Sequence, residues 1–160
     1  MKNRKRGFSL VELLIVLAVI AALIATITPV ALNAIKKAKA TQVAQNLKTL
    51  ASALENAAYV NGINSSGNDI GLISGVSTIG NLGRDIDENK YGIVYAQTNG
   101  AFTAVVFYLG GDADVYTVDD VLSEATSTAP DVPSGTYTKT LGADFIETNG
   151  IYYRITFNVY

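Results

Sequence analysis

The chain has 160 residues, which is room for one domain of ordinary size and one long additional element. It contains no cysteine and no histidine, so disulfide frameworks, thiolate metal sites and histidine-based hydrolytic sites are excluded. Four of its twelve basic residues precede Gly7, and a chain starting at Phe8 would carry a side-chain charge of −6 rather than −2. Such an acidic product argues against a surface that neutralises phosphates, so we expect no direct binding of nucleic acid.

The segment 8–32 is almost entirely apolar. A helix needs about 20 residues to cross a hydrocarbon core of about 30 Å, so this segment is long enough to span a membrane. Because the basic residues lie before it, we expect residues 1–7 in the cytoplasm and everything after Leu32 outside. The exceptions to its apolar character are Ser9, Glu12, Thr26, Thr28 and Pro29.

A secretory signal peptide is the alternative interpretation of this start. Its apolar region should hold about 7 to 15 residues and be followed closely by a small-residue cleavage site. Here the apolar run is longer, and the nearest Ala-x-Ala sequence, at 38–40, lies beyond two lysines within a helical pattern. We therefore favour a retained transmembrane helix at 8–32.

The helical pattern continues beyond the membrane segment. Apolar residues recur at steps of three and four, most clearly at Val43, Leu47, Leu50 and Leu54, which predicts an amphipathic helix. Asn61-Gly62 supplies the stop signal. We predict one helix over 8–60, about 80 Å long, in which only Pro29 should introduce a bend.

The remainder, 61–160, should form a globular head. Residues 61–90 are rich in Gly, Asn and Ser and predict a connecting loop. Two Asn-Gly pairs predict hairpins, one joining 91–98 to 101–109 and one joining 144–148 to 151–160. A short helix near 118–125 should start at a Thr117 cap, with Asp120 completing a capping box.

The last strand alternates, with one apolar face that needs cover. The stripe of Val43, Leu47, Leu50 and Leu54 is the natural partner for that face. The predicted fold is α+β, with a long N-terminal helix packed on a C-terminal antiparallel sheet of about four strands, 91–160. The apolar face holds Ile151, Tyr153, Ile155, Phe157 and Val159.

The most informative cluster is at the N-terminus. Basic residues precede Gly7, aromatic Phe8 follows it, Glu12 lies four residues further on, and Pro29 comes late in the apolar run. In these features residues 1–60 resemble the type IV pilins and the pseudopilins of type II secretion, whose precursors carry a class III leader. The resemblance implies that a prepilin peptidase removes residues 1–7 and methylates the new amine of Phe8. The alternative is that Gly7 is only a flexible residue between a basic tail and a helix.

Glu12 places a carboxylate near the edge of the hydrocarbon, where an unpaired charge is costly and usually marks a functional contact. A straight helix would hold the Phe8 amine of the same chain about 6 Å away along its axis, so a neighbouring subunit is better placed to pair with Glu12. The resemblance implies this intersubunit pairing. Alternatively, Glu12 extends to the membrane surface or is protonated.

Pro29 has a similar pair of interpretations. It is either a tolerated kink or, as the resemblance implies, a point at which the helix unwinds in the filament. Many relatives also carry a glycine where this chain has Ala21, so the resemblance predicts less unwinding here.

Four carboxylates follow Gly110-Gly111 and are weak candidates for calcium ligands, because calcium takes about six to eight oxygens. Their spacing does not match an EF-hand, and a solvated acidic turn before a helix explains them equally simply. We therefore expect no cofactor. The candidates are Asp112, Asp114, Asp119 and Asp120.

These observations predict a structural filament subunit and not an enzyme. It should lie in the cytoplasmic membrane as a single-pass protein, be processed by prepilin peptidase, and polymerise with itself through the pilus assembly machinery into a surface or periplasmic filament. A surface pilus, a type II secretion pseudopilus and a competence pilus all fit the pattern. A membrane-anchored extracellular binding domain is the alternative from a different class.

Overall fold

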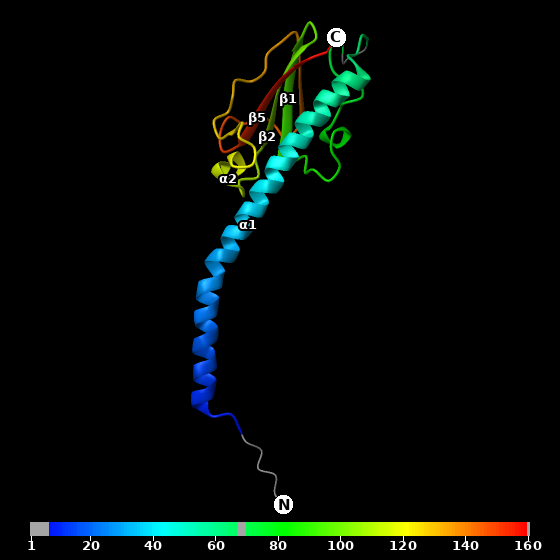
Figure 1. Ribbon diagram of the computed structural model, residues 1–160. Coiled ribbons are helices and arrows are strands. Elements are labelled where there is room, and N and C mark those ends of the chain that lie inside the picture. Colours follow the sequence, from blue (N-terminus) through cyan, green and yellow to red (C-terminus); the bar gives the residue numbers. More distant parts are fainter. Residues whose placement is uncertain (1–6, 67–69, 160) are drawn as a thin grey trace, which may run out of the picture. The chain divides into compact units, whose positions relative to one another are not determined.

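The computed structural model describes residues 7–66 and 70–159. Its chain divides into two compact units, one ending at Lys37 and the other spanning Ala38–Tyr160. Helix α1, Leu10–Asn61, contributes to both units (Figure 1). The predicted long helix is confirmed. It begins two residues later than the expected 8–60, because Phe8 and Ser9 are not helical, and it ends one residue later.

In the first unit α1 consists mainly of leucine, isoleucine, valine and alanine, and a helix pairs its backbone groups within the segment except where Pro29 lacks an N–H. Pro29 lies inside the helix and does not end it. Nearby hydroxyls bond to carbonyls one turn back, with Thr26 Oγ1 2.9 Å from the Leu23 oxygen and Thr28 Oγ1 2.7 Å from the Ile24 oxygen. These bonds satisfy threonine hydroxyls that would otherwise face an apolar environment.

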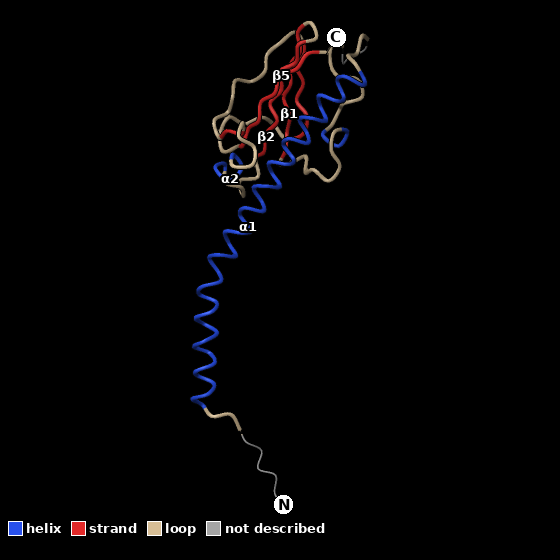
Figure 2. The backbone as a smooth tube through the Cα atoms, in the orientation of Figure 1, coloured by secondary structure: helices blue, strands red, loops and turns tan. Residues whose placement is uncertain are grey.

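The second unit contains an antiparallel sheet (Figures 1 and 2). Its five strands lie in the order β3-β5-β2-β1-β4. The α+β prediction is confirmed, with one strand more than expected. β3 and β4 have no counterpart among the predicted strands, and the two residues of β3 are too few to show an alternating pattern. The bounds are β1 Tyr91–Thr98, β2 Ala101–Tyr108, β3 Ala125–Thr126, β4 Tyr137–Gly142 and β5 Ile151–Asn158.

The first predicted hairpin is confirmed. β1 and β2 pair along their full length, from Tyr91↔Tyr108 to Thr98↔Ala101. The turn residues Asn99 and Gly100 both have positive φ, 50° and 83°, as a two-residue type I′ connection requires. A Cβ on Gly100 would also lie 2.4 Å from the Val159 carbonyl oxygen, so this position needs glycine for space as well as for conformation.

The second predicted hairpin was wrong. β5 pairs with β2 and β3, whereas β4 lies at the opposite edge of the sheet beside β1. Residues 144–148 form no strand, although Asn149 has a positive φ of 61°. A turn signal predicts a reversal of the chain but does not specify which strands pair, and here Phe145 packs on the sheet rather than extending it.

The short helix also lies earlier than predicted. α2 covers Val115–Asp119 rather than 118–125, and its N-cap is Asp114 instead of Thr117. The Asp114 carboxylate accepts from Thr117 N at 3.2 Å and from Thr117 Oγ1 at 2.9 Å. Asp114 and Thr117 are both possible N-caps, three residues apart, and aspartate is the stronger of the two residue types. The helix therefore starts after Asp114. The predicted loop 61–90 contains one short 3-10 helix, Ile79–Asn81.

The main core lies between α1 and one face of the sheet. Val43, Leu47, Leu50 and Leu54 are completely buried and belong to one hydrophobic cluster with sheet residues such as Ile93. Burial of side chains of this size contributes about 1.5–3 kcal/mol each, which explains why this half of α1 stays on the sheet. From β5 the cluster takes Ile151, Tyr153, Ile155 and Phe157, with Val159 just beyond the strand.

A second, smaller cluster lies on the other face of the sheet, which was expected to be exposed on β5. Val94, Val105, Phe107 and Tyr152 are buried there beneath the segment that contains Phe145. The rings of Phe107 and Phe145 meet edge to face at 5.2 Å, a favoured aromatic geometry. The Tyr152 hydroxyl donates to the Ile146 carbonyl oxygen. This cysteine-free segment is thus held by aromatic packing, by the bond from the Tyr152 hydroxyl and by the bond from Ala143 N to the Tyr91 carbonyl oxygen at 3.0 Å.

Candidate functional site

The described part of the N-terminal motif begins at Gly7 and Phe8, which lie outside α1. The Phe8 side chain is 87% exposed. A Cβ added to Gly7 would have no heavy atom within 4 Å, so nothing in this chain's own fold requires glycine at that position. The basic residues of the predicted leader, 1–6, lie outside the described residues.

The start of α1 is closed by a capping box between Ser9 and Glu12. Ser9 N donates to Glu12 Oε2 at 2.9 Å, and Glu12 N donates to Ser9 Oγ at 3.2 Å. The first helical bond runs from Leu13 N to the Ser9 carbonyl oxygen at 3.2 Å. Two backbone donors that a helix start leaves unpaired are thereby satisfied reciprocally. The spacing Ser-x-x-Glu is readable from the sequence, although Glu12 was expected to act only as a charge.

Glu12 and Phe8 are placed differently from the expectation for a continuous helix. The expected distance of about 6 Å to the Phe8 amine assumed a helix that includes Phe8, and Phe8 precedes the helix instead. The Glu12 carboxylate also has a donor within its own chain, the Ser9 N–H. A hydrogen-bonded carboxylate near hydrocarbon is less costly than a bare one, yet it still carries its charge.

The helix that follows the box presents apolar side chains to its surroundings on all sides. Every residue from Gly7 to Ala38 is exposed in this structure, including Leu17 at 58% and Ile27 at 61%. Its most apolar window has a mean hydropathy of 2.9, and α1 is long and apolar enough to cross a membrane. Such a surface requires lipid or other protein to cover it. Pro29 lies within this exposed stretch.

The four calcium candidates have separate roles. Asp112 Oδ2 lies 3.1 Å from Lys39 Nζ, and Asp114 caps α2, which ends at Asp119. Asp120 is the C-cap of α2. Within the ranges 7–66 and 70–159 no three Asp, Glu, His or Cys side chains are gathered as metal ligands.

Asp112 belongs to a polar cluster that ties α1 to one end of the sheet. The Tyr108 hydroxyl donates to Asp112, and Asn46 Nδ2 donates to the Tyr91 hydroxyl at 3.1 Å. Burial and the Asp112 carboxylate raise the pKa of Tyr108, while the hydrogen bond from Tyr108 and the Lys39 ammonium lower the pKa of Asp112. The sequence contains no signal for this cluster, because Lys39 and Asn46 are far along the chain from the side chains that they contact.

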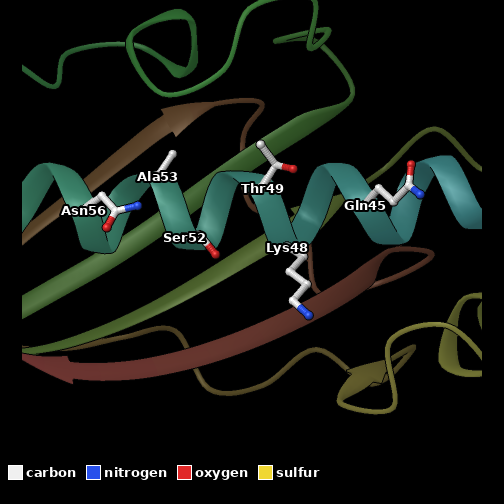
Figure 3. Close-up of a pocket in the computed structure, with 6 residues that line it drawn as sticks. All are labelled: Gln45, Lys48, Thr49, Ser52, Ala53 and Asn56. Atoms are coloured by element: carbon white, nitrogen blue, oxygen red, sulfur yellow. The ribbon is translucent and has the colours of Figure 1, made fainter.

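A shallow depression of about 440 Å³ lies along the outer face of α1 in the second unit (Figure 3). Its lining contains one cation and no carboxylate, so it offers no acid–base pair and no metal ligand set. The lining residues are Gln45, Lys48, Thr49, Ser52, Ala53 and Asn56.

Comparison with known proteins gives one match. The family model of the prokaryotic N-terminal methylation motif matches residues 2–28, which include Gly7, Phe8 and Glu12. Neither a curated protein nor a solved structure matches the chain. The matched range covers the basic leader, the capping box and most of the apolar helix. The chain therefore carries the class III leader of type IV pilins and pseudopilins, and with it the motif for N-terminal methylation.

Proposed function

We propose that this protein is a structural subunit of a type IV pilus-like filament that polymerises through its apolar N-terminal helix. The observation that carries the proposal is continuity: the methylation motif at 2–28 runs directly into a helix whose side chains are all exposed up to Ala38. A surface of this kind is stable in a bilayer and equally stable in a bundle of identical helices. Anchoring in the membrane before assembly and burial in the filament afterwards therefore need no change in the helix.

In this proposal a prepilin peptidase cuts after Gly7 and methylates the amine of Phe8. Glu12 then pairs with the Phe8 amine of a neighbouring subunit and sets the axial register. Support comes from the position of Glu12 as the only charged residue between Phe8 and Ile35. Because a charge pair is strongest where water is excluded, this contact would discriminate between registers that are otherwise equally apolar.

The head, Ala38–Tyr160, forms the outer part of the subunit in this proposal. A pseudopilus subunit of type II secretion or a subunit of a competence pilus would carry the same N-terminal segment. We therefore propose the whole class of type IV pilus-like filament subunits, which includes both. We do not propose catalysis, because the depression on α1 has no carboxylate beside its one lysine, and Asp112 and Asp114 serve as an ion-pair partner and a helix cap.

The test is the N-terminus and intact mass of the protein recovered from its native cells, in the sheared surface fraction and in the membrane fraction. The proposal expects sheared filaments whose subunits begin at N-methylated Phe8. An uncut Met1 found only in membranes would overturn it in favour of a membrane-anchored extracellular domain.

A further inference from the structure

The bond proposed for cleavage, between Gly7 and Phe8, lies just outside α1. Helix α1 begins at Leu10, and residues 7–9 have no regular secondary structure. A peptide bond inside a helix has its N–H and C=O engaged by the helix and wrapped by side chains. A peptide in extended form offers those groups to a binding cleft. The distance of the helix start from this bond therefore matters for processing.

Several features of the sequence would allow α1 to extend toward the leader. Arginine and lysine are good helix formers, and the three residues before Gly7 are all of these types. Near hydrocarbon, where water is scarce, backbone groups gain most from internal hydrogen bonds. Gly7 alone opposes such an extension by its conformational freedom.

The capping box engages the donors that an extension would need. Extending the helix by one residue requires Glu12 N–H to bond to the Phe8 carbonyl, and extending it into the leader also requires Ser9 N–H to bond to the carbonyl of Lys5. In the structure that N–H is taken by Glu12 Oε2 at 2.9 Å. The second arm, from Glu12 N to Ser9 Oγ at 3.2 Å, places the Ser9 hydroxyl where it stabilises a helix start at Leu10 and no earlier.

We infer that the Ser9–Glu12 capping box positions the processing site, by ending α1 at Leu10 and keeping the Gly7–Phe8 bond in non-helical backbone for the peptidase. The inference rests on the proposed function and adds Ser9 to it as a positioning residue. The reaction is hydrolysis: water supplies the oxygen of the new Gly7 carboxylate, and the Phe8 nitrogen leaves as an amine that takes up a proton. Both partners of the box lie after the cut, so the box survives processing.

The experiment uses the full-length precursor in membrane vesicles with a prepilin peptidase, and follows the loss of residues 1–7 by intact mass. Ser9→Ala removes the cap, and the initial rate of cleavage should fall about three- to tenfold. Ser9→Asp restores a strong N-cap through a different side chain and should return the rate to near the wild-type value. Ser52→Ala, the same change at an exposed position of α1, should leave the rate unchanged.

A second measurement follows the backbone itself. In detergent micelles, the Cα chemical shifts of Gly7 and Phe8 should move toward helical values in Ser9→Ala and stay non-helical in Ser9→Asp. Slow cleavage of Ser9→Asp would mean that the peptidase contacts the hydroxyl directly, and it would overturn the inference. Slow cleavage of Ser9→Ala without helical chemical shifts would also overturn it. Equal rates for wild type and Ser9→Ala would do the same. Failure of the wild-type precursor to be cut at all would instead count against the proposed function.

Discussion

At the scale of one residue, Glu12 combines a capping role within its own chain with a proposed pairing role between subunits. Its carboxylate accepts from Ser9 N in the uncut chain, and the proposed filament asks it to attract the amine of a neighbour. These roles are compatible because a carboxylate has two oxygens and about four acceptor positions. The cap needs only an acceptor, whereas pairing with an amine needs the charge.

The amide variant Glu12→Gln separates the two roles. Glutamine at this position still completes a capping box, so cleavage after Gly7 should proceed at the wild-type rate. Without the negative charge, the yield of sheared filaments should fall at least about tenfold, which corresponds to losing about 1.4 kcal/mol at the contact. Glu147→Gln, an exposed position in the head, is the matched control. Normal filament yield from Glu12→Gln would remove the charge pair from the assembly scheme.

Asp112 offers a residue-scale test of the polar cluster in the head. Its pKa is lowered in the folded protein, first by the hydrogen bond from Tyr108 and then by Lys39. A lowered pKa means that the ionised carboxylate stabilises the fold at any pH above its unfolded value near 3.9. That contribution is lost as the pH falls through the lower, folded pKa.

Asp112→Asn should therefore destabilise the head at pH 7 by about 1 kcal/mol or less, a small value because the pair is half exposed. The difference from wild type should shrink below about pH 4, as the wild-type carboxylate itself becomes neutral. Thermal unfolding of the full chain in detergent at several pH values measures this. Asp131→Asn, at an exposed position, is the control. A difference that does not change with pH would contradict the assigned cause.

At the scale of elements, α1 is a single helix with two environments. Up to Ala38 its side chains are exposed on all sides, whereas from Ala40 onward one face is buried against the sheet. The same type of substitution should therefore destabilise the head when it is made in the second half of α1 and leave the head unchanged when it is made in the first half. Hydrophobic side chains in the first half contribute to packing only after lipid or another subunit covers them.

Leu47→Ala should lower the free energy of unfolding of the head by about 2–5 kcal/mol, because Leu47 is completely buried and its truncation leaves a cavity. Leu17→Ala makes the same chemical change at a side chain that is 58% exposed, and should leave the unfolding of the head unchanged. Chemical denaturation of the full chain in detergent, followed by tyrosine fluorescence, compares the two. Equal destabilisation by both variants would contradict the assignment of the core.

The segment after β4 is the second element with a distinct role. Without a disulfide, it is held by Phe145 against Phe107 and by the hydroxyl of Tyr152. Phe145→Ala should expose this face of the sheet and cost about 1–3 kcal/mol, since Phe145 is only partly buried. Limited proteolysis should then cut near 143–150 faster than in wild type. Ile146→Ala, whose side chain is 50% exposed, serves as the comparison and should resist cutting as wild type does.

At the scale of the whole molecule, the two compact units differ in what they need from their surroundings. The second unit, Ala38–Tyr160, contains both hydrophobic clusters, whereas α1 up to Lys37 contains no buried side chain among the described residues. The head, Ala38–Tyr160, is therefore stabilised by its own core, whereas the part of α1 up to Lys37, here called the stem, offers its apolar surface for association. Transfer of the stem from lipid to a bundle of helices need not disturb the head.

A fragment spanning 38–160 should therefore fold alone as a soluble monomer with one cooperative unfolding transition, because it retains both clusters. The full chain should need detergent to stay dispersed, because its exposed apolar helix has no cover in water. Size-exclusion chromatography with light scattering measures both. Aggregation of the fragment would show that the head depends on the stem.

The sequence by itself determined the features that depend on neighbouring residues along the chain. The leader motif, the apolar span, the stripe from Val43 to Leu54 and the Asn99-Gly100 turn are local patterns, and hydrogen bonding or periodicity within one element is enough to define them. The Ser9–Glu12 box belongs to the same class and was equally readable.

Only the tertiary structure decided how distant segments meet. It placed β4 at the edge beside β1 rather than next to β5, buried Tyr152 beneath the segment that contains Phe145, and brought Lys39 to Asp112. Many pairings of amphipathic strands satisfy the same alternation, and the choice among them depends on packing over the whole sheet. The free energy that decides the pairing is a sum over contacts between residues far apart in the chain. A local sequence pattern does not contain those contacts.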